Sequence, residues 1–291
     1  MIRVSFFISK KGKGYTLRKV SKKMKVFISA DIEGVATTTL WEETRTQSNP
    51  AQAAPHAKQM TAEVLAACNG AIAAGADYIL VRDAHGSATN IDITQLPECV
   101  EVVRNWSGNP CGMVEGIDSS FDAAMYVGYH AAAGRDGTPL SHTCTLSTVW
   151  IKLNGVKMSE FMMYSLYINS LGVPSVFLSG DKTLIEDSKD MHPLLKTVTT
   201  KSGYGGMTTN RNPGLVCKEI QATVEEALKQ ENLKSGCIPM PEHYVFQVCY
   251  KECKMATKYS FFPGFKKIDD NTIEMETDNL MDILVATKFI L

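Results

Sequence analysis

The sequence contains no C-x-x-C pair and no long apolar run. Eight cysteines are spread over 291 residues, and the closest two, Cys249 and Cys253, have three residues between them. No second pair lies nearby to complete a cysteine-ligated zinc site, and the spacing argues against a disulfide scaffold. We therefore expect reduced thiols in a cytoplasmic protein. No apolar run approaches the roughly 18 residues needed to cross a bilayer, so no membrane partner is predicted.

Acidic side chains are missing from the first 23 residues, which hold eight of the 30 lysines and arginines. The other 268 residues carry 22 bases and all 31 acids, a net charge of −9. An acidic body argues against nucleic acid as a partner. The only apolar stretch of the leader, VSFFI, is shorter than the roughly seven residues of a secretory signal core. We expect residues 1–23 to be a disordered basic leader outside the native core, with Met24 as the true start.

Several catalytic motifs are also missing. The sequence has no G-x-x-x-x-G-K-[ST] phosphate loop, no H-E-x-x-H metal motif and no G-x-S-x-G nucleophile elbow. The glycine-rich stretch 203–206 lacks the strand and helix that flank a dinucleotide loop, so it is interpreted as a mobile loop. Nucleotide-binding and serine-hydrolase chemistry are therefore disfavoured.

Apolar strands and helical patterns alternate along the chain. Hydrophobic residues make up 44% and charged residues 21%, which is typical of a soluble globular protein. The alternation predicts an α/β fold with a mainly parallel, doubly wound sheet in a metal-binding domain over 24–200, and a smaller α+β domain over 201–291. Strands are predicted over 25–30, 77–86, 99–105, 122–131, 174–181, 244–251, 259–265 and 271–277, with a hairpin turn at Asn154-Gly155. Helices are predicted over 56–75, 159–172, 212–233 and 278–291.

Three of the predicted parallel strands end in side chains that bind metals. Asp31 and Glu33 end the first, Asp83 and His85 the second, and His130 the fourth. Ligands gather at the carboxyl ends of parallel strands, and residues i and i+2 face the same side. Any one of these residues alone is more often a cap. Carboxylates and imidazoles at three tips of one sheet instead predict a site for zinc or a similar divalent ion.

The motifs SADIEG, RDAHG, MVEG, GYHA and SHT, followed by Glu160, resemble those of the D-aminopeptidases of the DppA type, a family of dinuclear zinc peptidases. Their order and spacing agree with the family pattern from Met24 to the C-terminus, and the stretch 259–277 is also similar to the family's C-terminal region. Two departures are modest. Ala84 stands where a bacterial relative has serine, and the segment between His130 and His142 is one residue longer.

The resemblance implies two zinc ions per chain, with Asp31 as the bridging carboxylate, and a catalytic role for His142 as nucleophile or as acid/base. On sequence alone, Glu160 is an acid that complements the N-terminal dipole of a helix, a role compatible with metal binding. Asp83 is either a residue that orients His85 or a plain strand-end cap. The metal ligands implied by the resemblance are Asp31, Glu33, His85, His130 and Glu160.

The resemblance further implies a metal-dependent aminopeptidase that removes N-terminal residues from short peptides, D-amino-acid peptides included, through a water that bridges the two ions. It implies a homo-oligomer, since the relatives form a decamer. One alternative is a dinuclear metallohydrolase of another amide or ester. A phosphoesterase would add Arg or Lys near the metals, and the motif strands offer only Arg82. The other alternative is a non-catalytic metal-binding assembly protein.

Overall fold

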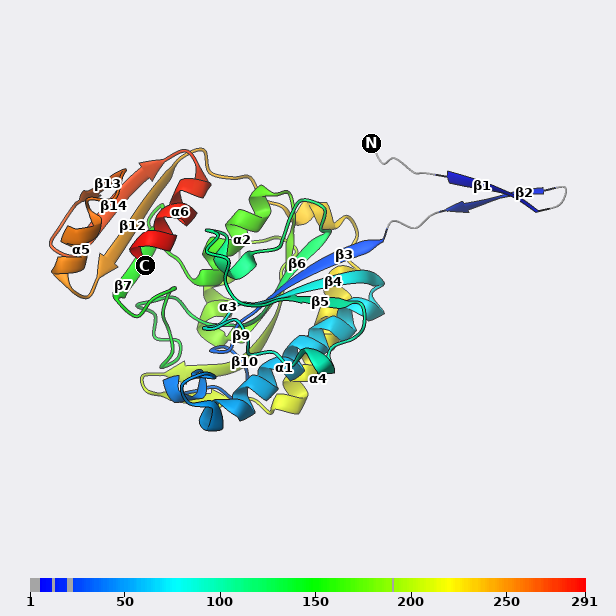
Figure 1. Cartoon of the computed structure of the whole chain (residues 1–291), viewed down its shortest axis with the longest axis horizontal. Helices are drawn as coiled ribbons and strands as arrows, with labels where there is room; N and C mark the ends of the chain where they lie inside the picture. Colours follow the sequence, from blue (N-terminus) through cyan, green and yellow to red (C-terminus); the bar gives the residue numbers. More distant parts are fainter. Residues whose placement is uncertain (1–5, 12–13, 20–22, 190) are drawn as a thin grey trace.

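The computed structural model of the chain describes all residues except 1–5, 12–13, 20–22 and 190, and a seven-stranded sheet forms its centre (Figure 1). The strand order is β11-β10-β9-β6-β3-β4-β5. All neighbouring strands are parallel except β10 and β11, which confirms the predicted α/β fold with a mainly parallel sheet. The strands are β3 (Met24–Ala30), β4 (Ala76–Asp83), β5 (Val100–Val103), β6 (Ala123–Tyr129), β9 (Ser175–Asp181), β10 (Lys196–Tyr204) and β11 (Met207–Asn210).

The strand order reverses between β3 and β6. From β3 the chain continues to β4 and β5 on one side, whereas β6, β9 and β10 extend the sheet on the other side. In open parallel sheets this reversal leaves a crevice beyond the carboxyl ends of the two strands. The strand ends that carry Asp31 and His130 are therefore neighbours at the place where such folds bind ligands.

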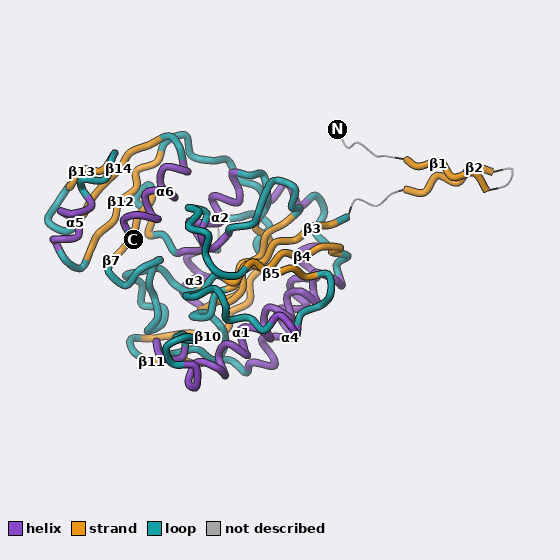
Figure 2. Tube along the Cα trace, in the orientation of Figure 1, coloured by secondary structure: helices purple, strands orange, loops and turns teal. Residues whose placement is uncertain are grey.

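The two faces of the sheet carry separate cores, because successive side chains of a strand point to opposite faces. Val26 and Ile28 pack with α1 and α4, whereas Phe27 belongs to the core that includes Phe161 of α2. Figure 2 shows α1 and α4 side by side against the strands. Helices on both faces make the sheet doubly wound, as predicted. The helices of this region are α1 (Pro50–Ala73), α2 (Glu160–Ser170), α3 (Lys182–Ser188) and α4 (Pro213–Leu228).

A second, five-stranded antiparallel sheet of order β13-β14-β12-β7-β8 shares the core on the α2 side. The β7–β8 turn at Asn154-Gly155 confirms the predicted hairpin, because both residues have the positive φ angles, 49° and 81°, of a tight two-residue turn. The strands of the second sheet and the two helices of the same region are β7 (Thr148–Leu153), β8 (Val156–Lys157), β12 (Tyr244–Tyr250), α5 (Cys253–Tyr259), β13 (Phe265–Lys267), β14 (Thr272–Thr277) and α6 (Leu280–Ile290).

The domain division at residue 200 stays a prediction, and the two sheets do not divide there. Residues 148–157 contribute strands to the second sheet, while residues 201–228 return to the first sheet and its α4 layer. The stretch 203–206, interpreted as a mobile loop, is the end and turn of the β10–β11 hairpin.

The strand predicted over 259–265 is wrong, because α5 ends at Tyr259 and only Phe265 joins a strand. The ring of Phe262 instead stacks on that of Phe289 of α6 and packs edge-on to Phe265. These aromatic contacts, rather than strand pairing, place the segment.

In the leader, β1 (Phe6–Lys11) and β2 (Gly14–Lys19) pair as an antiparallel hairpin that joins neither large sheet. An isolated two-stranded hairpin is only marginally stable, so disorder of residues 1–23 stays a prediction. Part of that range lies outside the described residues. Within the described part of the chain, no helix is long and apolar enough to span a bilayer.

Candidate metal centre

The loop after β3 is pressed against the end of β6. The backbone N–H of Asp31 donates to Val127 at 2.8 Å, and that of Gly34 donates to Gly128 at 2.7 Å. A Cβ atom on Gly34 would lie 1.8 Å from the carbonyl oxygen of Tyr129, so only glycine fits this close approach. The glycine in the DxEG motif therefore lets the chain pass β6 while both acids stay at the strand tip.

Lys201 of β10 holds the same loop through hydrogen bonds to its backbone. Its ammonium group is fully buried and donates to the carbonyl oxygens of Glu33, Val35 and Thr38. The hydroxyl of Thr200 donates to the carbonyl of Gly34 at 2.5 Å. Burial lowers the pKa of Lys201 to about 8. The backbone that carries Glu33 is thus fixed by three hydrogen bonds from one side chain.

Asp31, Glu33 and His85 form one cluster that could hold a metal ion. Nδ1 of His85 lies 3.3 Å from Oδ1 of Asp31 and 3.0 Å from Oε2 of Glu33. The other ring nitrogen, Nε2, lies 2.9 Å from the carbonyl oxygen of Thr44 and donates to it when it carries the proton. In that tautomer the lone pair on Nδ1 faces both carboxylates.

His130, Glu160 and His142 form the second such cluster. Nε2 of His130 lies 3.3 Å from Oε2 of Glu160, and its Nδ1 lies 3.0 Å from the carbonyl oxygen of Ala131. Glu160 opens α2 directly after Ser159, which caps the helix as predicted. Its Oε1 accepts a 2.7 Å hydrogen bond from the backbone N–H of Cys144.

Asp31 joins the two clusters. Its Oδ1 faces His85, while its Oδ2 lies 3.3 Å from Nε2 of His130. One carboxylate therefore contacts both groups, which is the arrangement expected of a bridging ligand. The structure brings all five predicted ligands to this point, and their role as ligands stays a prediction.

The electrostatics of the centre favour added positive charge. Burial by itself lowers the pKa of His130, but the nearby negative charges of Glu160 and Asp31 raise that pKa well above its usual value. Burial likewise opposes a raised pKa at His85, and the charge of Glu33 overrides it. Burial by itself raises the pKa of Asp31, but the two imidazoles that face it, His130 and His85, outweigh burial and lower that pKa. The field that holds protons on these imidazoles also attracts cations.

Unpaired buried atoms indicate where a metal fits. Oδ2 of Asp31, Oε2 of Glu33 and Nε2 of His130 have no hydrogen-bond partner among the described residues. Such atoms are costly to bury unless an ion or water contacts them. Carboxylate oxygens and imidazole nitrogens are also the donor set of zinc and similar ions. The residues present therefore fit a divalent metal centre.

His142 is the member of the second cluster that lies on the loop before β7. Its ring stacks on that of His130 at a centroid distance of 4.3 Å, and its Nε2 lies 3.6 Å from Oε1 of Glu160. Nδ1 lies 2.8 Å from the carbonyl oxygen of Leu140, while the edge of Trp41 packs against the ring. His142 is thus held in place with one nitrogen directed toward the cluster.

Asp83 holds the loop that carries His85 and does not touch the imidazole ring. Its carboxylate accepts hydrogen bonds from the backbone N–H groups of Asn90 and Ile91 and from the Asn90 side chain. The same Asn90 amide donates to the backbone carbonyl of His85 at 2.7 Å. Of the two roles left open by the sequence, the structure favours a loop cap that positions His85 through Asn90.

Sequence reasoning missed the groups that orient the cluster. The carbonyl of Thr44, the N–H of Cys144 and the ammonium of Lys201 all belong to the backbone or to distant segments. Trp41 is one of only three tryptophans and follows the DxEG loop closely, which was the one available clue.

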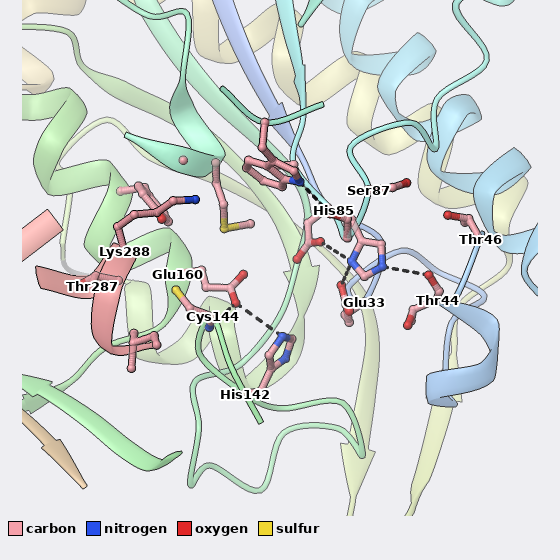
Figure 3. A pocket seen from close by; sticks show the side chains of 18 of the residues that line it. Glu33, Thr44, Thr46, His85, Ser87, His142, Cys144, Glu160, Thr287 and Lys288 are labelled. Carbon is pink, nitrogen blue, oxygen red and sulfur yellow. Dashed lines mark hydrogen bonds and ion pairs between the residues drawn. The ribbon is translucent and has the colours of Figure 1, made fainter. Parts of the chain in front are cut away.

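A cavity of about 710 Å³ opens onto the centre (Figure 3). Its walls include the aromatic rings of Trp41, Trp106 and Tyr164 and the side chain of Met113, with Asp31, Glu33, His85, His142 and Glu160 at its base. Leu284, Thr287, Lys288 and Leu291, at the end of the chain, line another wall. Within the described residues, Arg45 and Lys288 are the lysine and arginine side chains that line it.

The chain is similar to known proteins over nearly its whole length. A family model described as D-aminopeptidase matches residues 24–289. The D-aminopeptidase of Bacillus subtilis (strain 168) is 22% identical over 265 residues, which cover 90% of this chain and 95% of the relative. The solved structure of the "Zn-dependent D-aminopeptidase DppA from Bacillus subtilis, a self-compartmentalizing protease" has a TM-score of 0.83 at 20% identity, covering 92% of this chain and 96% of that one.

Proposed function

This chain belongs to the D-aminopeptidase family, which makes it an enzyme that hydrolyses peptide bonds, and we propose that it is a metal-dependent aminopeptidase acting on short peptides, D-amino-acid peptides included. The family match supports the reaction class. The observation that carries the proposal is the position of Asp31, whose two carboxylate oxygens face two separate clusters of ligand atoms.

The proposed cofactor is zinc, with two ions per chain. Asp31, Glu33 and His85 would hold one ion, while Asp31, His130 and Glu160 would hold the other. The name of the Bacillus structure supports zinc. Three carboxylates against two divalent ions leave one positive charge, which is compatible with the burial of these acids. When bound, the ions supply Lewis-acid polarisation of the scissile carbonyl and lower the pKa of water.

His142 is the proposed acid/base group. Its Nδ1 contacts the carbonyl of Leu140, so Nε2 is the atom that can accept a proton and return it to the leaving amine. Stacking on His130 and packing against Trp41 fix the plane of the ring. The negative charges of Asp31, Glu33 and Glu160 attract the free amine of a peptide toward the same end of the cavity.

A homo-oligomer is also proposed, because the Bacillus relative is described as self-compartmentalizing. Large apolar side chains that one chain leaves exposed are compatible with assembly, and a decamer is the state to test. They include Tyr204, Met207, Phe261 and Phe289. A cytoplasmic location fits the eight unpaired cysteines. Light scattering on the purified protein measures the number of subunits.

A substrate panel tests the proposed activity. Zinc-loaded protein is assayed with short D- and L-peptides, with their N-acetylated forms and with phosphate esters. We expect hydrolysis of free peptides and no hydrolysis of the acetylated ones, because an aminopeptidase needs the free amine. Cleavage of other amides or of esters alone would favour a different metallohydrolase. A metal-loaded protein that cleaves nothing would favour a non-catalytic metal-binding protein.

A further inference from the structure

Lys288 places a positive charge in the wall of the cavity that holds the candidate metal centre. It lies in the last turn of α6 and lines the same cavity as Asp31, Glu33 and Glu160. Figure 3 shows its side chain pointing from α6 into the cavity. Lys288 is exposed and lines the cavity, so its position raises the question of what its ammonium group binds there.

No carboxylate of the described residues forms an ion pair with this ammonium group. Among the residues that the structure describes, Lys288 takes part in no side-chain hydrogen bond or ion pair, although Glu160 lies in the same cavity. Figure 3 shows Thr44 and Thr46, which flank the other cationic residue, Arg45, on the opposite side of the cavity from Lys288. The two cations that line the cavity therefore lie on different walls.

The charges of the cavity match the two ends of a short peptide. A free dipeptide or tripeptide carries an amine at one end and a carboxylate at the other. The proposed aminopeptidase function, on which this inference rests, places the amine at the acid-rich metal end. The carboxylate then enters a cavity with aromatic walls, where an anion needs a charged partner to offset its lost hydration.

We propose that Lys288 binds the C-terminal carboxylate of the substrate and so makes this enzyme selective for short peptides with a free C-terminus. The lysine ammonium is a compact point charge on a flexible stem, which suits carboxylates at slightly different distances from the metals. A longer or amidated peptide lacks a carboxylate at that place and loses the contact. Lys288 is thus a specificity-determining residue.

A structural role has to be separated from this one. A lysine in the last turn of a helix also complements the negative end of the helix dipole, without any substrate. Its loss would then lower stability and change the kinetics of every substrate alike. The ratio of KM values for two substrates that differ only at the C-terminus separates the two roles, because a purely structural role would leave this ratio unchanged.

The test compares alanyl-alanine dipeptides, in D and L forms, with the same dipeptides as C-terminal amides. Zinc-loaded wild type, Lys288→Met and Lys288→Arg are assayed. We expect a KM for the free acid at least about tenfold below that of the amide in the wild type. Lys288→Met should raise the KM of the acid about tenfold or more and leave that of the amide within about twofold, as loss of one charge-assisted contact predicts. The kcat should change little, because the carboxylate is bound equally in ground and transition states.

Matched variants make the result specific. Lys288→Arg should restore most of the preference for the acid, and Arg45→Met, which removes the other cation, should leave the ratio of acid to amide unchanged. Equal KM values for acid and amide in the wild type, or equal losses for both in Lys288→Met, overturn the role of Lys288 while leaving the aminopeptidase intact. A wild type that cleaves neither dipeptide overturns the proposed function as well.

Discussion

Nε2 of His130 lies 3.3 Å from Oδ2 of Asp31, and neither atom has a hydrogen-bond partner among the described residues. With the Nδ1 proton of His130 directed to the carbonyl of Ala131, the two facing atoms both carry lone pairs. Two buried lone pairs at this distance repel unless a proton or a cation lies with them. A metal ion held by Asp31, His130 and Glu160 would remove the repulsion without protonating the imidazole.

Asp31→Asn should weaken metal binding at both sites and lower activity. Asparagine keeps the shape but removes the negative charge that both ions share, so metal content should fall from two ions per chain to one or none. Activity should fall by more than the roughly 10- to 100-fold cost of changing an outer-shell partner. Elemental analysis and kcat/KM on the same sample measure both effects. Asp278→Asn, at an exposed acid that does not line the cavity, should change neither quantity.

Metal removal should destabilise the fold. Without cations, Asp31, Glu33 and Glu160 remain as three buried carboxylates around two imidazoles. Zinc that binds only the folded state adds about 2.7 kcal/mol to the free energy of unfolding at 100 times its Kd. We therefore expect a chelator to lower Tm in a thermal melt and added zinc to restore it. A Tm that is indifferent to both treatments contradicts the proposed centre.

His142→Ala should affect activity and not metal content. The imidazole belongs to the second cluster, but the proposed ligands of the ion there are Asp31, His130 and Glu160. Loss of a general acid/base costs about 10²- to 10⁴-fold in rate. Elemental analysis and steady-state kinetics separate the possibilities. If zinc is lost together with activity, His142 is a ligand rather than the acid/base.

Gly34→Ala should destabilise the protein at the end of β3. The new methyl group would meet the carbonyl of Tyr129 at 1.8 Å, and backbone against backbone has little room to relax. We expect a loss of at least about 3 kcal/mol, the upper part of the range for overpacking. Chemical denaturation measures it. Gly206→Ala is the matched control, because nothing lies within 4 Å of its added Cβ and stability should be almost unchanged.

Glu63 of α1 should make stability depend on pH. Its carboxylate is buried beside the β3 loop and accepts hydrogen bonds from the N–H of Ala36 and the amide of Gln59. Burial raises its pKa from 4.5 to about 7 against these bonds. Between those values the folded protein retains a proton that the unfolded chain has released. The free energy of unfolding therefore falls by ~3 kcal/mol as pH rises from about 4.5 to about 7.

Glu63→Gln removes this titration while keeping the shape of the side chain. The free energy of unfolding of E63Q, relative to that of the wild type, should rise by about 2–3 kcal/mol as pH goes from about 5 to about 8. Urea denaturation at a fixed zinc concentration measures the free energy of unfolding of both proteins at each pH. Other titrating groups contribute equally to both proteins, so they cancel in the difference. Glu42→Gln, at an exposed position in the same region, should give no such trend. A constant difference between E63Q and wild type contradicts the assignment.

Local pattern was enough to predict the parallel sheet and its ligand-bearing tips. Apolar strands followed by Asp31, His85 and His130 bring these side chains to one edge, because parallel strands end together. Glu160 and His142 could be placed only by resemblance. They flank the β7–β8 hairpin, which belongs to a different sheet, and no periodicity in the sequence predicts how two sheets dock.

The features that the sequence did not predict depend on contacts between residues far apart in the sequence. Lys201 lies 168 residues from Glu33 yet bonds to its carbonyl, and α6 lines a cavity built mostly by the first 164 residues. The stretch 259–265 was predicted as a strand, but in the structure the ring of Phe262 stacks on that of Phe289 and only Phe265 joins a strand. Such outcomes depend on packing partners that only the folded chain brings together.

Three histidines of the centre each direct one ring nitrogen to a main-chain carbonyl, those of Thr44, Ala131 and Leu140. Every amino acid supplies a carbonyl, so substitutions at positions 44, 131 and 140 can accumulate over evolutionary time without releasing the imidazoles. Selection then acts on the path of the backbone more than on these side chains. Divergence of the side chains at these three positions is therefore compatible with an unchanged orientation of the rings.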